Sequence, residues 1–149
     1  MSLEFYLITG IILGLLFTEL TGLSPGGIIV PGYLAYSFYS PINIALTLAI
    51  SITVYFCVIL LSKLFFLFGR RRYALVILLG IFLKLSLDYF LNFFNTDSIG
   101  YLQIIGYLVP GLIANDLYKQ GIIKTILSSA IVTSLVYIIA MGVSFAIYQ

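Results

Sequence analysis

Four long apolar runs dominate the chain, and short polar or glycine-rich stretches separate them. The runs cover residues 5–20, 42–61, 73–94 and 122–147. Each run approaches or exceeds the about 20 residues that an α-helix needs to cross the hydrocarbon core of a bilayer. The pattern therefore predicts four transmembrane helices, with a polar turn at 95–100 after the third.

Two shorter apolar segments lie between these runs and resemble each other. Residues 27–39 read GIIVPGYLAYSFY, and residues 106–118 read GYLVPGLIANDLY. Each copy is flanked by two of the long apolar runs, which indicates that the repeat is architectural. Aligned without gaps, the copies share Gly27/Gly106, Val30/Val109, Pro31/Pro110, Gly32/Gly111, Ala35/Ala114 and Tyr39/Tyr118.

Both copies place a Pro-Gly pair inside an apolar sequence. Proline disfavours helical geometry for the residue before it, and it suits the first position of a new helix. We therefore predict extended geometry at Val30 and Val109, and a short helix that starts at Pro31 and another at Pro110. Such a start leaves backbone N–H groups free at the positive end of the helix dipole. Matching interrupted segments in two halves point to a binding site in membrane proteins. The alternative is a pair of ordinary Pro-Gly turns.

Composition narrows the class of protein. Hydrophobic residues make up 62% of the chain and charged residues 8%, whereas about a quarter of the residues of a soluble domain are charged. The chain has no His and only one Cys, Cys57, which argues against zinc sites, disulfides and Ser-His or Cys-His catalysis. It also lacks a Gly-rich phosphate loop for ATP. We predict an all-α polytopic membrane protein with one domain, residues 1–149, no catalytic residue and no metal site.

The basic residues set the predicted topology. Arg70, Arg71 and Arg72 make 63–72 the only strongly basic loop, and such loops stay in the cytoplasm. If both Pro-Gly segments cross the membrane, Lys119 and Lys124 join the arginines on that side, whereas re-entrant segments would leave these lysines outside. The lysines favour crossing. The halves, residues 1–62 and 73–149, then form an inverted repeat in which each half has two long helices and a Pro-Gly-broken segment.

Three charged residues of the apolar runs are the candidates for an intramembrane position. Lys84 and Asp88 are four residues apart and share one helical face, so we expect an ion pair that faces the bundle interior. An unpaired charge at that depth would cost about 2.5–3.5 kcal/mol. Glu19, near the end of the first run, is expected to pair with Lys or Arg or to cap a helix N-terminus.

Four motifs resemble one known family in their order along the chain. They are FTELTGLSPGGIIVPGYLAYSF, GRRR, LKLSLDY and VPGLIAND followed by KQG. This order resembles the integral membrane subunit of bacterial poly-γ-glutamate synthase, the CapC/PgsC type, over nearly the whole chain. The resemblance implies a multi-pass protein of the bacterial cytoplasmic membrane that takes part in making and exporting poly-γ-glutamate. It also implies that a separate ligase subunit, related to the Mur ligases, carries out the amide chemistry with ATP and Mg.

The resemblance gives the candidate residues specific expected roles. A polyanionic polymer needs a path with positive potential, which helix starts at Pro31-Gly32 and Pro110-Gly111 could provide. The structural alternative is that these residues only let helices pack closely. Lys84 could contact the carboxylates of the polymer. The arginines at 70–72 could anchor the topology at anionic lipid or dock an acidic surface of the ligase.

Two function classes remain open from the sequence. The first is a non-catalytic membrane subunit that anchors the ligase and forms part of the polymer path. Its partners would be membrane lipid, the ligase, other capsule-synthesis subunits and the polymer, with a homo-oligomer also open and no nucleic acid. The second is a free-standing small carrier for an anionic metabolite. Co-purification with a Mur-like ligase would discriminate between them.

Overall fold

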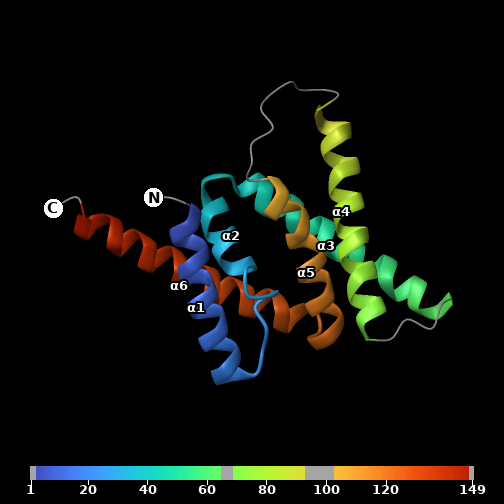
Figure 1. Cartoon of the computed structure of the whole chain (residues 1–149), viewed down its shortest axis with the longest axis horizontal. Coiled ribbons are helices and arrows are strands. Elements are labelled where there is room, and N and C mark those ends of the chain that lie inside the picture. Colours follow the sequence, from blue (N-terminus) through green and yellow to red (C-terminus); the bar gives the residue numbers. More distant parts are fainter. Residues whose placement is uncertain (1–2, 65–68, 93–102, 148–149) are drawn as a thin grey trace.

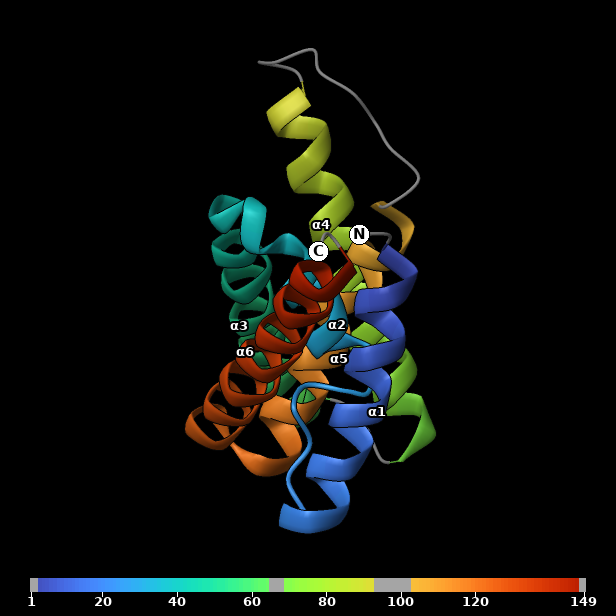
Figure 2. The same ribbon diagram turned by 90° about the vertical axis from the view of Figure 1, so that its left-hand side faces the viewer.

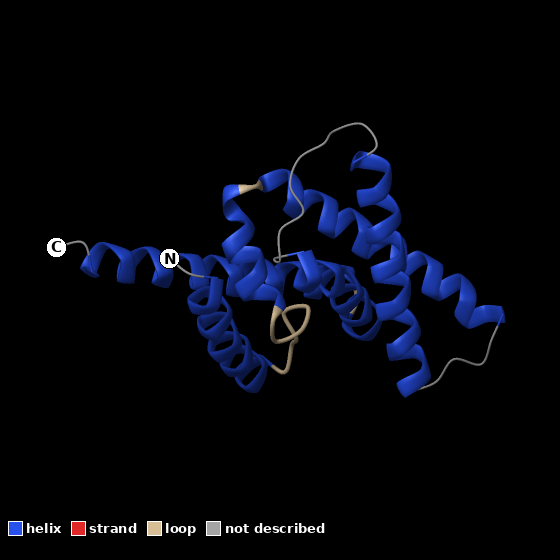
Figure 3. Ribbon diagram, turned by 45° about the horizontal axis from the view of Figure 1, so that its top comes forward, coloured by secondary structure: helices blue, strands red, loops and turns tan. Residues whose placement is uncertain are grey.

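The structure is a computed structural model that describes residues 3–64, 69–92 and 103–147. Helices account for most of these residues, and none of them lies in a strand (Figures 1 and 3). The all-α prediction is therefore confirmed for the described chain. The elements are α1 (Leu3–Thr21), α2 (Val30–Tyr36), the 3-10 helix η1 (Ser37–Tyr39), α3 (Pro41–Leu64), α4 (Arg70–Asn92), α5 (Gln103–Gln120) and α6 (Ile122–Ile147).

Four of the helices match the four apolar runs. By length and composition, α1, α3, α4 and α6 could each cross a membrane, as predicted. Large apolar side chains on these helices are exposed, among them Ile42, Phe82 and Phe145. Such an outer surface would be unfavourable in water and suits contact with lipid or with apolar partners.

The helices run in alternating directions. In Figure 2, α1, α3 and α5 run downwards, whereas α4 and α6 run upwards, and Figure 1 shows that α2 also runs upwards. The loop after α1, the start of α4 and the α5–α6 turn therefore lie at one end of the molecule, and the first turn of α1 and the α2–α3 connection lie at the other. We call the first of these the basic end, because it holds Arg70, Arg71, Arg72, Lys119 and Lys124.

The third helix of each half packs on the other half. Helix α6 lies against α1 and α2, and α3 lies against α4 and α5; in Figure 1 the free ends of α6 and α3 project to opposite sides. The α1–α2–α6 core cluster consists of Tyr6, Ala35, Val132, Val136 and Ala140. The α3–α4–α5 core cluster consists of Ile50, Val54, Val58, Val76 and Ala114. A central cluster from α2 and α5 consists of Val30, Leu34, Val109, Ile113 and Leu117.

Two pairs of glycines bring backbones into direct contact at corresponding places. A β-carbon added to Gly10 of α1 would lie 2.5 Å from the Cα of Gly32 in α2. A β-carbon added to Gly80 of α4 would lie 2.8 Å from the Cα of Gly111 in α5. Real β-carbons do not approach other atoms so closely, so each crossing requires glycine on both helices. The helix pairs α1–α2 and α4–α5 therefore pack through equivalent contacts.

The predicted break at Pro110 is wrong. Helix α5 continues through Pro110, which cannot donate the usual hydrogen bond to the carbonyl four residues earlier, at Gly106. Membrane helices tolerate such a proline where neighbouring helices surround it, and Pro110 is fully buried. The predicted extended geometry of Val109 is wrong for the same reason.

The first Pro-Gly segment begins a short helix. Helix α2 begins at Val30 with Pro31 in its first turn, and Ile29 already has helical dihedral angles. The prediction that Val30 is extended is therefore wrong. The chain instead reverses earlier, at Gly26 and Gly27, whose φ angles of 89° and 106° suit glycine and few other residues. Because the turn is completed there, Val30 is free to join the helix.

The basic stretch differs from the predicted loop at 63–72. Helix α3 continues to Leu64, and α4 already begins at Arg70, so the three arginines form the first turn of α4. The predicted turn at 95–100 lies outside the described residues.

Candidate functional site

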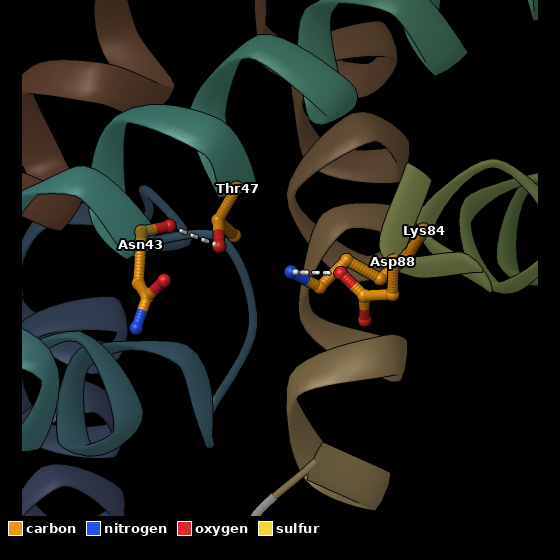
Figure 4. A network of polar contacts seen from close by, with 4 residues as sticks. All are labelled: Asn43, Thr47, Lys84 and Asp88. Carbon is orange, nitrogen blue, oxygen red and sulfur yellow. Dashed lines mark hydrogen bonds and ion pairs between the residues drawn. The ribbon is translucent and has the colours of Figure 1, made fainter. Parts of the chain in front are cut away.

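The predicted ion pair on α4 is present. The Nζ atom of Lys84 lies 3.5 Å from Oδ1 of Asp88, and the two side chains are 15% and 23% exposed. Figure 4 shows the ammonium of Lys84 pointing from α4 towards the part of α3 that carries Asn43 and Thr47. The Thr47 hydroxyl donates a 2.7 Å hydrogen bond to the Asn43 carbonyl. An open cavity of about 580 Å³ lies beside Asp88 and Tyr107, so the acidic member of the pair borders a space that another molecule could enter.

The four Pro-Gly candidates lie in helix contacts. Pro31 and Pro110 are fully buried, and Gly32 and Gly111 are also buried. A β-carbon at Gly32 would lie 2.5 Å from the carbonyl oxygen of Tyr6. This arrangement supports the structural interpretation, in which these residues let helices pack closely.

The expected partner of Glu19 is absent from the described residues. Glu19 is exposed near the end of α1, and Lys84–Asp88 is the ion pair found in the described part of the chain. The prediction that Glu19 pairs with Lys or Arg or caps a helix is wrong there. The reason is that Glu19 lies on the outward face of the last turn of α1, where solvent or lipid head groups can accommodate a carboxylate.

The three arginines differ in their surroundings. Arg70 and Arg71 are exposed, whereas Arg72 is half-buried. The guanidinium carbon of Arg72 lies 4.4 Å from the centre of the Tyr118 ring, a cation–π contact that ties the start of α4 to the end of α5. Arg70 and Arg71 are therefore the arginines that remain accessible to a partner.

A polar cluster that the sequence did not predict joins the loop after α1 to α5. It consists of Ser24, Asn115, Asp116 and Gln120. The Ser24 hydroxyl donates to Asp116 Oδ2, and the Ser24 N–H donates to Gln120 Oε1 at 3.0 Å. Gln120 Nε2 in turn donates to the Ser24 carbonyl. These bonds join residues more than 90 positions apart and fix the loop on the basic end.

The cluster holds a buried acidic residue that forms no ion pair with the described part of the chain. Asp116 is 6% exposed and Asn115 is 3% exposed. No basic side chain in the described residues lies within ion-pair distance of Asp116, and the buried Asn115 Oδ1 has no hydrogen-bond partner there. A cavity of about 320 Å³ borders both residues, together with Ser24 and the exposed Lys119.

Only one signal in the sequence could have indicated this cluster. The second Pro-Gly copy has Asn115-Asp116 where the first has Tyr36-Ser37, so a buried acid stands at a position that its counterpart fills without charge. Its partners, Ser24 and Gln120, come together only through the packing of the loop against α5.

Comparisons with known proteins give one consistent result. The family model described as capsule biosynthesis CapC matches residues 9–126. The PGA biosynthesis protein CapC of Bacillus subtilis (strain 168) is 41% identical over 134 residues, which are 89% of each chain. The capsule biosynthesis protein CapC of Bacillus anthracis is 42% identical over 121 residues, 80% of each chain. No solved structure matches. The chain belongs to the CapC family of capsule biosynthesis proteins.

Proposed function

We propose that this chain is an integral membrane subunit of a complex that makes and exports poly-γ-glutamate, and that it anchors the ATP-dependent ligase of that complex. Family membership supports the role in capsule synthesis, and the name of the Bacillus subtilis relative supports the identity of the polymer. In this proposal the ligase, with its ATP and Mg, carries out the amide chemistry. The free-standing carrier is the weaker alternative, because the relatives are named for biosynthesis.

We further propose that the halves form an inverted repeat in the membrane of the bacterial cell. The alternating helix directions support this (Figure 2), as do the matched contacts of Gly10–Gly32 and Gly80–Gly111. The core clusters also correspond, since Ala35 and Ala114 occupy the same position of the repeated segment. Positively charged ends of membrane proteins stay in the cytoplasm, so the basic end faces inwards.

The observation that carries the anchoring role is the gathering of basic residues at one end. Arg70, Arg71, Lys119 and Lys124 are exposed there. Such a surface attracts anionic lipid and an acidic partner. The ligase would therefore dock on the inner face of the membrane, where ATP is available.

The polymer would pass beside this subunit and not through its Pro-Gly contacts, which are filled by packed backbone. Lys84 lies towards the outer end of α4, and its partner Asp88 borders the cavity of about 580 Å³. Lys84 could contact carboxylates of the polymer in a path completed by other subunits or by a second copy.

Cysteine labelling tests the proposed topology. In a chain with Cys57→Ser, single cysteines at Arg71 and Lys119 should both resist an impermeant thiol reagent applied to intact cells. Ser40→Cys, an exposed position at the opposite end of the molecule, should react and serves as the matched control. Reaction at position 119 without reaction at 71 would reject the inverted repeat and support re-entrant segments.

Co-purification with the ligase tests the anchoring role. Arg70→Gln combined with Arg71→Gln should weaken the association roughly three- to tenfold, because exposed charge pairs contribute about 0.2–1 kcal/mol each. The loss should be smaller in high salt, because the Debye length falls to about 3 Å at 1 M and exposed charges then interact only weakly. Arg72→Gln is the matched control, since its guanidinium already stacks on Tyr118. Equal, salt-independent binding by the parent chain and both variants would contradict docking through these arginines.

A further inference from the structure

We propose that the cavity between the loop after α1 and the end of α5 binds the head group of an α-amino acid, meaning an ammonium and a carboxylate on one carbon atom. The cavity measures about 320 Å³ and is lined by Ser24, Asn115, Asp116 and Lys119, with apolar walls that include Ile28 and Leu112. A volume of this size falls within the range of small-molecule sites.

The floor of this cavity suits a cationic hydrogen-bond donor. The Asp116 carboxylate accepts hydrogen bonds from the Ser24 hydroxyl and, at 3.3 Å, from Asn115 Nδ2, and these two neutral donors leave its charge uncompensated. The buried Asn115 Oδ1 has no donor among the described residues. Burying an unpaired charge and an unsatisfied amide oxygen together is costly. A primary ammonium supplies three N–H donors and one positive charge, and so satisfies both groups at once.

The mouth of the cavity has the opposite charge. Lys119 lies one turn beyond Asn115 on α5, and its side chain is exposed while Asn115 and Asp116 are buried. A ligand whose ammonium reaches the floor would therefore present a neighbouring carboxylate to Lys119. A bare metal cation would gain nothing from this lysine, and a simple anion would be repelled by Asp116. The acid at the floor and the lysine at the mouth therefore favour a zwitterion over a cation or an anion alone.

The site is not a by-product of the repeated segment. The positions that correspond to Asn115 and Asp116 in the first copy are Tyr36 and Ser37, and Ser37 is buried without a charge. A loop that needed only a structural contact with Ser24 could use a neutral residue in place of Asp116. The acid therefore serves a purpose that packing does not require.

The ligand follows from the proposed function, on which this step rests. Free glutamate carries this head group, and so does the amino end of a γ-linked polyglutamate chain, whose first residue keeps its α-amino and α-carboxylate groups. The site faces the basic end, where the ligase is proposed to act. It would hold either the incoming monomer or the end of the polymer.

Calorimetric titration of the full-length chain in lipid nanodiscs tests the site. L-glutamate or D-glutamate should bind at least about tenfold more tightly than glutarate, which lacks the ammonium, because charge-assisted hydrogen bonds are lost. Asp116→Asn should weaken glutamate binding by a similar factor. Lys119→Gln, an exposed position that leaves the fold intact, should make glutamate and 4-aminobutyrate bind alike. Glu19→Gln, an exposed acid outside the cavity, is the matched control and should change nothing.

A γ-linked triglutamate separates the two sources of the head group. Binding at least as tight as that of glutamate identifies the polymer end, and preference for glutamate identifies the monomer. The proposal is overturned if glutarate and glutamate bind equally, if sodium chloride alone stabilises the chain and glutamate adds nothing, or if no ligand binds. Those results would leave co-purification with the ligase unaffected, so they would not count against the proposed function.

Discussion

Gly32→Ala is expected to remove most of the folded protein from the membrane, although it adds only one methyl group. The new β-carbon would lie 2.5 Å from the carbonyl oxygen of Tyr6 and 2.9 Å from the Cα of Leu7. Backbone atoms cannot rotate away as a side chain could, so α1 and α2 must separate. We expect a loss of about 3 kcal/mol, at the upper end of overpacking effects, which shifts the folding equilibrium roughly a hundredfold. Gly80→Ala, at the equivalent crossing of α4 and α5, should behave in the same way.

Gly142→Ala is the matched control for this substitution. Gly142 lies in α6, and a β-carbon there would have no neighbour within 4 Å. Alanine favours helices over glycine by about 0.5–1 kcal/mol, so this variant should be neutral or slightly more stable. The measurement is the yield of monodisperse protein and its unfolding temperature in nanodiscs. A stable Gly32→Ala protein would show that α1 and α2 do not cross as closely as described.

The second large effect is expected at the ion pair of α4. Lys84→Ala and Asp88→Ala should each cost about 2–3 kcal/mol, because each leaves a mostly buried charge without its partner. The double variant should cost less than the sum of the single variants by about 1–2 kcal/mol, since the lone charge is then also removed. Unfolding in nanodiscs gives all the required free energies.

Polymer production separates structure from function at this pair. Lys124→Ala, an exposed lysine at the basic end, is the stability control and should stay within about 0.5 kcal/mol of the parent chain. Strict additivity of the two single variants would mean that the side chains do not interact. If Lys84→Ala leaves the complex assembled but stops surface poly-γ-glutamate, the lysine has a role beyond its salt bridge.

The long apolar helices and the contact between charged residues one helical turn apart could be predicted from the sequence, whereas local backbone geometry could not. The four apolar runs became α1, α3, α4 and α6, because length and hydropathy suffice to define a spanning helix. The spacing of Lys84 and Asp88 was likewise enough to predict their contact. The Pro-Gly pairs gave the same local signal twice, yet only the first lies at a helix start. Packing around Pro110 and the glycine turn at Gly26-Gly27 decided the difference.

The cluster around Asp116 lay beyond prediction for a different reason. Ser24 and Asp116 are 92 positions apart, and no periodicity links a loop residue to one turn of a distant helix. The sequence does show an acid in an apolar segment, but only the fold shows that this acid is buried and that no described basic residue pairs with it. Glu19 is the opposite case. Its position near a helix end predicted a partner, but the sequence did not show that its side chain faces outwards.

The third helix of each half packs on the other half, and this arrangement has a consequence for biosynthesis. Helices α1 to α3 leave the ribosome before α6, but the surface of Tyr6 and Ala35 is covered by Val132, Val136 and Ala140 of α6. Helix α3 likewise cannot complete its packing until α4 and α5 have been made. Before that packing, exposing its core-facing Thr47 and Ser51 to lipid costs little free energy, because their hydroxyls already donate hydrogen bonds to carbonyls of α3. Folding is therefore completed only after α6 has been made, and the nascent first half must remain intact in the membrane until then.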